Sequence, residues 1–152
     1  MKAIIIREPW ISLILNGFKT WEMRNIATHY RGPVGLIRAG SGLVVGAANL
    51  IATHGPFSAQ ELMATRRLHQ VPVENFYKDG KQKWRYAWEL DSAVPLSAPV
   101  HYHHRSGSVI WVTLLDETIR LVELQLQRQM QNGGQAYRSD DPKLDPRKIA
   151  NY

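Results

Sequence analysis

The residues best suited to chemistry lie close together between positions 19 and 24. This stretch carries four polar groups of different kinds, namely Lys19, Thr20, Glu22 and Arg24. Because alternate side chains of a strand share a face, we expect positions 20, 22 and 24 on one face and Trp21 and Met23 on the other. Cations for phosphate, with donors and acceptors for a base edge, are the groups that a nucleotide requires. The simpler interpretation is a solvated strand face with a Glu22–Arg24 ion pair.

Lys19 is open to two chemical interpretations. It acts as a base if burial and the neighbouring Arg24 lower its pKa, since both disfavour the charged ammonium. Glu22 opposes that change in pKa because a carboxylate stabilises the ammonium. A lysine that binds phosphate needs fewer assumptions than a catalytic lysine. If the chain is an enzyme, we expect Lys19 and Glu22 to be its catalytic residues.

The short segment His101-Tyr102-His103-His104 raises the question of a metal site. In a strand, His101 and His103 would share a face and reach one ion. No third ligand is specified and the chain has no cysteine, so a surface strand or turn is favoured. The histidines would then contact phosphate or stack on a base. We therefore predict neither a metal site nor a cofactor.

Aromatic residues next to charged ones are a second feature that suits nucleic acid. Trp84 and Trp88 alternate with Arg85 and Glu89, and the two indoles could lie on one strand face. Aromatic rings on a strand stack on the bases of single-stranded RNA. A place in the core is favoured for Trp88, whereas Trp21 is ambiguous.

Several short elements must position these groups. Residues 2–7 are typical of a strand, and Pro9 suits the first position of a short apolar helix that ends at Asn16-Gly17. We expect this helix to plug an open end of a sheet. A strand then begins after Lys19, and a Gly-Ser-Gly turn joins two further strands in a hairpin. The hairpin strands are 34–39 and 43–52, and two further strands are expected over 83–90 and 108–114.

Two helices complete the predicted pattern. Ser58 and Glu61 form a capping box, so a helix is expected from Ser58 to about Leu68. Asp116 is expected to cap a final helix that ends at 132–134. The apolar stripe of this helix indicates packing against the core first and a homodimer contact second. The stripe consists of Ile119, Leu121, Val122, Leu124, Leu126 and Met130.

Length and composition agree with one domain of the α+β class. The 152 residues are 44% hydrophobic, which is enough for a core. We predict a small β-barrel of about five to six strands, with one domain over 1–134 and a polar tail over 135–152. No apolar run reaches the roughly 20 residues of a membrane helix, and the absence of cysteine fits a reducing cytosol. We therefore expect a cytoplasmic protein without a membrane partner.

The net charge of +6 is unevenly distributed along the chain. Residues 1–57 contain six basic and two acidic residues, a net of +4, whereas 115–152 contain six of each. A basic folded face suits a polyanion such as RNA. The alternative is that the charge only maintains solubility, and charge alone does not decide between the two.

The region from Arg7 to Arg24 resembles the signature of ASCH domains, which belong to the PUA-like group. That signature has a strand, a Pro-Trp that opens a helix, and a Gly-hydrophobic-Lys-Thr turn before Glu-x-Arg. The matching residues are Pro9-Trp10, Gly17-Phe18-Lys19-Thr20 and Glu22-Met23-Arg24. Later matches in the same order are Arg31-Gly32, 42–46, 86–90 with Pro95 or Pro99, and 107–111. The likeness covers residues 2–114.

The resemblance implies a PUA-like barrel that is linked to RNA, with a cleft between the barrel and the first helix. It places Lys19, Thr20, Glu22 and Arg24 at the mouth of that cleft. Family members include coactivator modules thought to bind nucleic acid, a single-strand ribonuclease, and amidohydrolases that deacetylate N4-acetylcytidine. Those amidohydrolases have a catalytic threonine three residues after the lysine, where this chain has Glu22, although Thr20 offers a hydroxyl nearby.

We therefore predict an RNA- or nucleotide-binding ASCH domain. The candidate binding residues are Lys19, Thr20, Trp21, Glu22, Arg24, Arg31 and Trp88. The three cations would hold phosphate, the hydroxyl and the carboxylate would read a base or sugar, and one of the two indoles would stack. The alternative is an enzyme in the same cleft, either a single-stranded RNA ribonuclease or an amidohydrolase of modified pyrimidine nucleosides such as N4-acetylcytidine. A third hypothesis is a protein-interaction module that uses the final helix.

Overall fold

The computed structural model describes residues 1–104, 106–107 and 110–132. Its main strands are β1 (Lys2–Ile6), β2 (Trp21–Arg24), β3 (Gly32–Arg38), β4 (Leu43–His54), β7 (Tyr86–His101) and β8 (Val112–Thr113). Two shorter strands, β5 (Tyr77–Lys78) and β6 (Lys81–Gln82), form a separate hairpin. The helices are α1 (Trp10–Leu15), α2 (Ala59–Ala64), α3 (Arg66–His69), α4 (Asp116–Gln131) and the 3-10 helix η1 (Val73–Phe76). The predicted polar tail, 135–152, lies outside the described residues.

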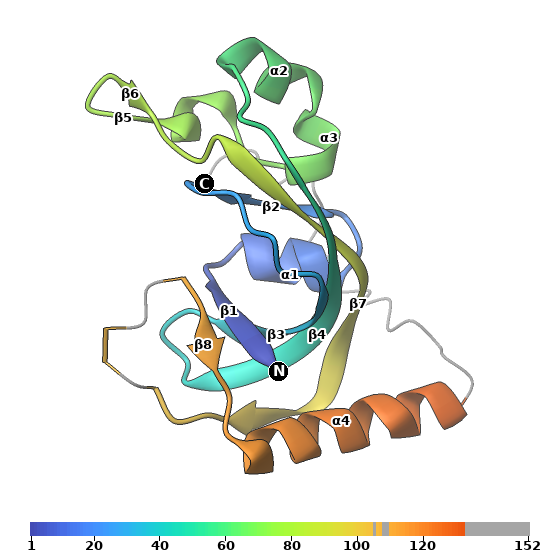
Figure 1. Ribbon diagram of the computed structural model, residues 1–152. Coiled ribbons are helices and arrows are strands. Elements are labelled where there is room, and N and C mark those ends of the chain that lie inside the picture. Colours follow the sequence, from blue (N-terminus) through green and yellow to red (C-terminus); the bar gives the residue numbers. More distant parts are fainter. Residues whose placement is uncertain (105, 108–109, 133–152) are drawn as a thin grey trace.

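The six main strands form one sheet in the order β2-β7-β4-β3-β1-β8, and this sheet curls into a half-barrel (Figure 1). β1 pairs in parallel with β3, and the other neighbours in the sheet are antiparallel. The predicted hairpin is confirmed as β3–β4, and its turn contains Gly40 and Gly42 at φ of 76° and 70°. Glycine adopts this left-handed backbone without steric cost. One sheet of mostly antiparallel strands with separate helices confirms the predicted α+β class.

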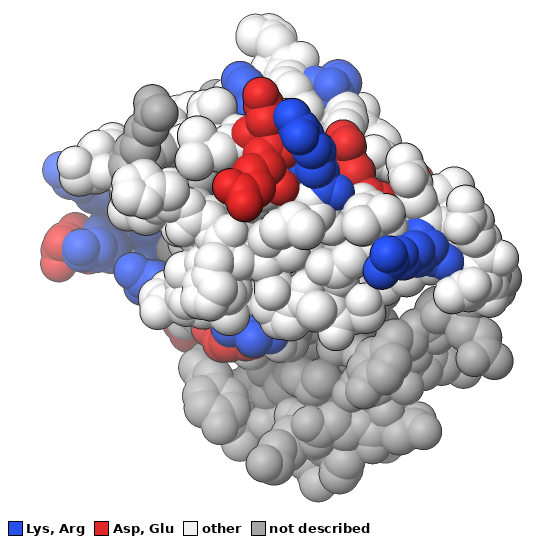
Figure 2. All heavy atoms as spheres, turned by 90° about the horizontal axis from the view of Figure 1, so that it is seen from below, with Lys and Arg blue, Asp and Glu red and all other residues white. Residues whose placement is uncertain are grey.

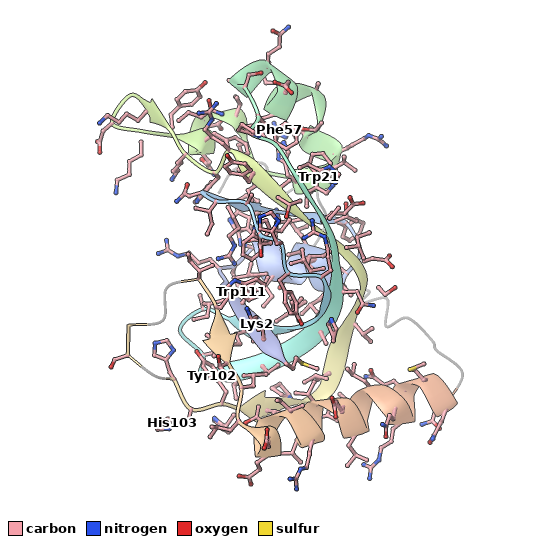
Figure 3. The ribbon with its side chains drawn as sticks, in the orientation of Figure 1. Lys2, Trp21, Phe57, Tyr102, His103 and Trp111 are labelled. Carbon is pink, nitrogen blue, oxygen red and sulfur yellow. The ribbon has the colours of Figure 1, made fainter. Side chains whose placement is uncertain are left out.

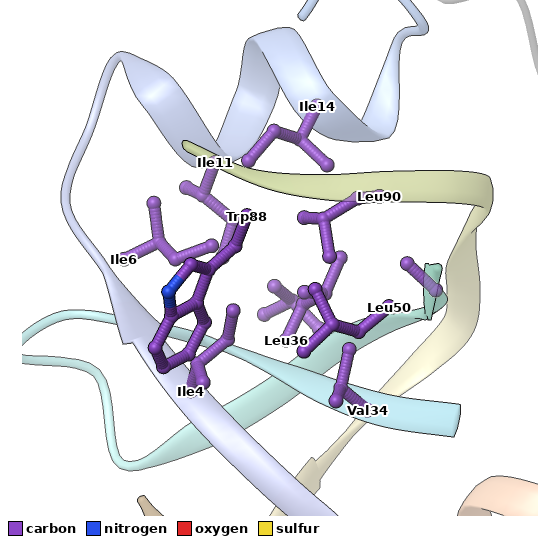
Figure 4. Packing of buried hydrophobic residues seen from close by; sticks show 11 residues of the cluster. Ile4, Ile6, Ile11, Ile14, Val34, Leu36, Leu50, Trp88 and Leu90 are labelled. Carbon is purple, nitrogen blue, oxygen red and sulfur yellow. The ribbon is translucent and has the colours of Figure 1, made fainter. Parts of the chain in front are cut away.

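α1 lies inside the curve of the sheet and fills it (Figure 1). Its Ile11 and Ile14 pack with Trp88 and with apolar residues of β1, β3 and β4 (Figure 4). The helix comes close to β4 at Gly46, where an added Cβ would lie 2.3 Å from Leu15 Cδ2 and 2.8 Å from a carbonyl oxygen of β7. The helix expected to plug the sheet is therefore present. It packs directly against the backbone of β4 at Gly46, where there is no side chain.

A small lobe built from α2, α3, η1 and the β5–β6 hairpin lies at one end of the half-barrel, over β2 (Figure 1). Trp21 and Met23 point from β2 into this lobe and pack against its apolar side chains. The buried residues of that cluster are Trp21, Met23, Leu62, Val71, Phe76 and Ala87. The two faces predicted for β2 are therefore confirmed, since Glu22 and Arg24 point the other way, toward the barrel interior.

The helix predicted from Ser58 begins as expected and then breaks. Ser58 Oγ accepts a hydrogen bond from the Glu61 N–H, and Glu61 Oε1 accepts one from the Ser58 N–H, each at 3.2 Å, so the capping box is confirmed. The single helix predicted to about residue 68 is instead split into α2 and α3 at Thr65. The Thr65 hydroxyl donates to the Glu61 carbonyl oxygen at 2.8 Å, which is the local hydrogen bonding by which threonine competes with helix continuation.

β7 differs at both ends from the strand predicted over 83–90. It begins only at Tyr86, because Trp84 has a left-handed φ of 54° and its N–H donates to Asn25 Oδ1 at 2.8 Å. It then continues past Pro95 and Pro99, where the pairing with β4 shifts register several times. Proline is tolerated at such irregularities because no ladder N–H is needed there. The hypothesis that Trp84 and Trp88 share one strand face is therefore wrong.

α4 packs across the far end of β7. Thr118 and Val122 are buried, and Gln125 exchanges two hydrogen bonds with the Ala98 backbone at 2.9 and 2.8 Å. The predicted core packing is confirmed for Ile119, Val122 and Leu126 but is wrong for Leu121, Leu124 and Met130, which are exposed. Asp116 is the first helical residue and does not cap the helix, whose N-cap is Leu115. Figure 2 shows the molecule from this side, where uncharged residues predominate outside the grey atoms and charged side chains form small separate groups. The dimer contact stays a prediction.

Candidate functional site

Lys19 is buried at the junction between the half-barrel and the small lobe. Only 2% of the residue is exposed. Its Nζ donates to the carbonyl oxygen of Trp21 at 2.5 Å and to that of His69 at 2.8 Å. It also lies 3.6 Å from Glu22 Oε2. The ammonium therefore links β2 to α3 and is buried, whereas the family resemblance implied a place at the mouth of a cleft.

Burial lowers the pKa of Lys19 from 10.5 to about 8. The cause is loss of hydration, which penalises the charged ammonium more than the neutral amine. Glu22 raises the pKa of Lys19 by attraction and by a hydrogen bond, and the positive charge of Arg24 lowers it. Each of these three directions is the one expected from the sequence, and burial outweighs the carboxylate.

Arg24 joins the edge strand β2 to β1, a strand near the other end of the sheet order. Its Nη2 donates to the carbonyl oxygen of Ile5 on β1 at 3.0 Å and lies 3.5 Å from Glu22 Oε1. The guanidinium lies over the Trp88 ring, 5.4 Å from its centroid. Arg24 Nε is buried and has no hydrogen-bond partner in the part of the chain that the structure describes. The Glu22–Arg24 pair of the simpler interpretation is thus present, but it is largely buried rather than solvated.

Lys19, Glu22 and Arg24 form a compact group, here called the charged cluster. It holds two cations against one carboxylate. Burying charges is costly unless they are paired and hydrogen-bonded, and here the positive charge is in excess. The arrangement can hold an anion, and its lysine can exchange a proton near pH 8.

The remaining predicted site residues lie around this cluster in different settings. Thr20 is exposed at the start of β2. Arg31 is exposed as well, and its Nη1 donates to the carbonyl oxygens of Thr28 and Tyr30 in its own loop at 2.9 and 2.7 Å. The structure therefore brings Thr20 to the surface beside the cluster and leaves Arg31 on a separate loop.

Trp88 and Trp21 are both buried, so neither presents an open ring to solvent. Trp88 is fully buried, stacks on Trp111 with ring centroids 5.0 Å apart, and donates from Nε1 to the Ile26 carbonyl oxygen. The core interpretation is the one that fits Trp88, and stacking on a base would need the ring to be uncovered. Trp21 stacks on His54 and Phe57, with centroids 4.8 and 5.4 Å apart.

A second aromatic group lies at the β1–β8 edge, where Lys2 and Trp111 lie side by side (Figure 3). Lys2 Nζ lies 5.0 Å from the Trp111 centroid and 5.2 Å from that of Tyr30. Trp111 in turn covers Trp88. Ring contacts therefore run from Trp88, beneath the Arg24 guanidinium, through Trp111 to the exposed Lys2.

Sequence reasoning missed two histidines that pack around Lys19 and Trp21. His54 Nε2 lies 2.5 Å from Glu89 Oε2, on the same side of the sheet as Trp21. His69 is buried, and burial lowers its pKa to about 4. Its Nδ1 accepts from the Val71 N–H at 2.9 Å, so the neutral ring carries its proton on Nε2 and donates to a carbonyl oxygen. Neither pairing has a sequence signal, because each depends on tertiary contacts between separate elements.

The histidine-rich segment lies away from the charged cluster. His101 ends β7, and Tyr102 and His103 lie on the connection toward β8 (Figure 3). The Tyr102 hydroxyl lies 3.2 Å from His104 Nδ1. Among residues 1–104, 106–107 and 110–132, no group of three metal-ligating side chains lies together. Over the same residues, no helix has the length and apolar character needed to cross a membrane.

Known proteins resemble this chain in sequence pattern and in fold. The family model of the ASCH domain, which describes its sequence pattern, matches residues 4–98, more than half of the chain. ASCH from Zymomonas mobilis has a similar structure, with a TM-score of 0.64 at 18% identity over 81% of this chain and 94% of that chain. Two mutant forms of that protein align with TM-scores of 0.63 at 20% identity, over 81% of this chain and 94% and 96% of theirs. No curated protein matches the chain. The structural neighbours show the fold, and the domain model shows that the chain belongs to the ASCH domain family.

Proposed function

We propose that this ASCH domain binds RNA or a nucleotide through the charged cluster. The observation that carries the proposal is that a buried cation, Lys19, and a partly buried one, Arg24, share the single buried carboxylate of Glu22. Buried ionisable groups with a perturbed pKa concentrate at functional sites. A phosphate group would compensate the excess positive charge. Its oxygens would also accept hydrogen bonds from donors that lack a partner among the described residues, such as Arg24 Nε.

The residues around the cluster would divide the ligand contacts among them. Thr20 and Arg31 are exposed and would meet the sugar or the phosphate first. Glu22 would accept a hydrogen bond from a base or sugar, and Arg24 would bind a phosphate group. Trp88 lies beneath the Arg24 guanidinium and would keep it in place rather than stack on a base.

A second function, hydrolysis in the same site, is favoured by the pKa of about 8 for Lys19. A general base works best when its pKa lies near the working pH. The neutral amine of Lys19 would take a proton from the attacking hydroxyl or water, and Glu22 would stabilise the ammonium that forms. The substrate would be single-stranded RNA or the amide of a modified pyrimidine nucleoside such as N4-acetylcytidine.

One experiment separates these two functions. Labelled single-stranded RNA and a panel of modified nucleosides would be incubated with the protein, and both binding and products would be followed. Lys19→Met removes the ammonium at similar length, and Lys19→Arg keeps a charge that does not titrate. Arg120→Gln, at an exposed position of α4, is the control for loss of one positive charge.

The outcomes point in different directions. Product that disappears in both Lys19 variants would identify an enzyme. Binding without product, weakened by salt and by Lys19→Met but not by Arg120→Gln, would support recognition. If the unaltered protein neither binds nor converts any of these ligands, both functions are refuted.

A further inference from the structure

We infer that the β5–β6 hairpin and the segment after it form a second contact surface for the ligand, which makes that ligand a single-stranded RNA chain rather than a free nucleoside. This inference rests on the proposed function and specifies its ligand. The surface, here called the hairpin surface, consists of Lys78, Lys81, Lys83, Trp84 and Arg85.

The hairpin surface is strongly basic. Residues 77–85 contain four cations and one acidic residue, Asp79. Lys78, Lys81 and Arg85 are exposed, and no ion pair of the described residues involves any of the four cations. Lys83 Nζ instead lies 4.0 Å from the centroid of the Trp84 ring. The charges are therefore available to an external anion.

Two lysines are paired within the hairpin, which is unfavourable for its stability and suits the binding of an anion. Lys78 and Lys81 are directly opposite each other on β5 and β6. Like charges at such positions repel and destabilise a hairpin. The turn between them, Asp79-Gly80, has φ of 51° and 71°, the left-handed backbone that favours tight hairpins. The chain thus holds two ammonium groups together in a fixed turn, an arrangement that a phosphate would stabilise.

Trp84 adds an aromatic ring to this basic surface. Its φ of 54° is rare for a bulky residue, and residues held in such sparsely populated backbone cluster at active sites and ligand-binding segments. The ring is half-buried, with Phe76 against it edge to face at 6.3 Å. Aromatic rings interleaved with cations are the pattern by which proteins hold single strands of RNA.

The hairpin surface begins next to the charged cluster along the backbone of β2 and β7. The Trp84 N–H is held by Asn25, the residue that follows Arg24. Arg24 is also the register partner of Tyr86, which comes directly after Arg85. In Figure 1 the β5–β6 hairpin projects from the lobe above β2. A polynucleotide held at the cluster would therefore meet Arg85 and Trp84 next, and then the lysines of the hairpin.

The test compares ligands of two lengths in the full chain. The double variant Lys78→Gln with Lys81→Gln removes the opposed charges from exposed positions. The matched control is Arg120→Gln with Arg128→Gln, which removes two exposed charges from α4. Each protein would be titrated with cytidine 5′-monophosphate and with a single-stranded RNA of about 12 nucleotides, within the range of site sizes of single-strand binders. The RNA titrations would be repeated at several salt concentrations.

The hairpin variant should bind the RNA more weakly and leave mononucleotide binding unchanged. The slope of log affinity against log salt should become shallower by about 1.4, since each phosphate contact on a single strand contributes about 0.7. The α4 control should match the unaltered protein in both respects.

Three results would overturn the inference. The first is an unchanged RNA affinity and salt slope in the hairpin variant while Lys19→Met still weakens binding, which leaves the proposed function intact. The second is loss of mononucleotide binding along with RNA binding in the hairpin variant. The third is equally tight binding of poly-L-glutamate, which would make the surface a site for acidic protein. Failure of the unaltered protein to bind either nucleotide ligand would instead refute the proposed function and the inference together.

Discussion

Lys19 should make the domain more stable as the pH rises above neutrality. Burial lowers its pKa from 10.5 to about 8 in the folded protein, so the unfolded chain holds this proton more tightly. Below pH 8 both states are protonated, and the folded state carries the full cost of a buried ammonium. Between about pH 8 and 10.5 the folded state releases the proton while the unfolded chain keeps it, so stability rises with pH.

The expected gain follows from the same two values. The difference between 10.5 and about 8 corresponds to about 3 kcal/mol of unfolding free energy. Lys19→Met removes the titrating group, so the difference between unaltered protein and variant isolates its contribution. All other groups are common to both proteins, so their contributions cancel in that difference.

The assay is urea unfolding of both proteins at intervals from neutral pH to about 10.5, with the difference in unfolding free energy plotted against pH. The unaltered protein should gain about 3 kcal/mol on the variant over this range. Lys19→Arg should show no such gain relative to Lys19→Met, because a guanidinium stays protonated. A flat difference for the unaltered protein would refute the reasoning, since it would mean that the folded state does not lower the pKa of Lys19.

Three further predictions concern stability. Burial lowers the pKa of His69 from 6.5 to about 4, so the domain should lose up to about 3 kcal/mol as the pH falls through this range, and His69→Gln should abolish that acid dependence in urea unfolding. Gly46→Ala should destabilise by about 1–3 kcal/mol, because its Cβ would overlap Leu15 and a β7 carbonyl; an unchanged melting temperature would contradict this packing. Ser58→Ala should cost about 1 kcal/mol through loss of the α2 cap, whereas the neighbouring Gln60→Ala should change the melting temperature little.

The elements that were predicted correctly are those whose signals are local. Pro9 before an apolar run, the capping box at Ser58 and the glycine-rich turn at 40–42 each determine backbone within a few residues. The face alternation of β2 was equally accessible, because a strand has a period of two. These signals were enough to place Glu22 and Arg24 on one face before any contact was known.

The features that were missed depend on contacts between distant elements. The left-handed backbone of Trp84 is stabilised by a hydrogen bond from its N–H to Asn25, 59 positions away. No residue near Trp84 in the sequence predicts this contact. The burial of Lys19 depends on α3, where the carbonyl oxygen of His69, 50 positions further along the chain, accepts a hydrogen bond from Lys19 Nζ. The continuation of β7 beyond the predicted strand 83–90, as far as His101, depends on register shifts against β4. Local pattern therefore located the candidate site but did not reveal that it is buried.

The length of β7 has a consequence for how the molecule comes apart. One hydrophobic cluster contains Ala87, another contains Trp88 and Leu90, and the third contains Leu96 and Val100. Because all three clusters share one continuous strand, pulling that strand from any of them exposes residues of its neighbours. The domain should behave as one cooperative unit, in which the backbone amides of the buried, paired residues Ala87, Trp88, Leu90 and Val100 of β7 exchange with solvent only through global unfolding.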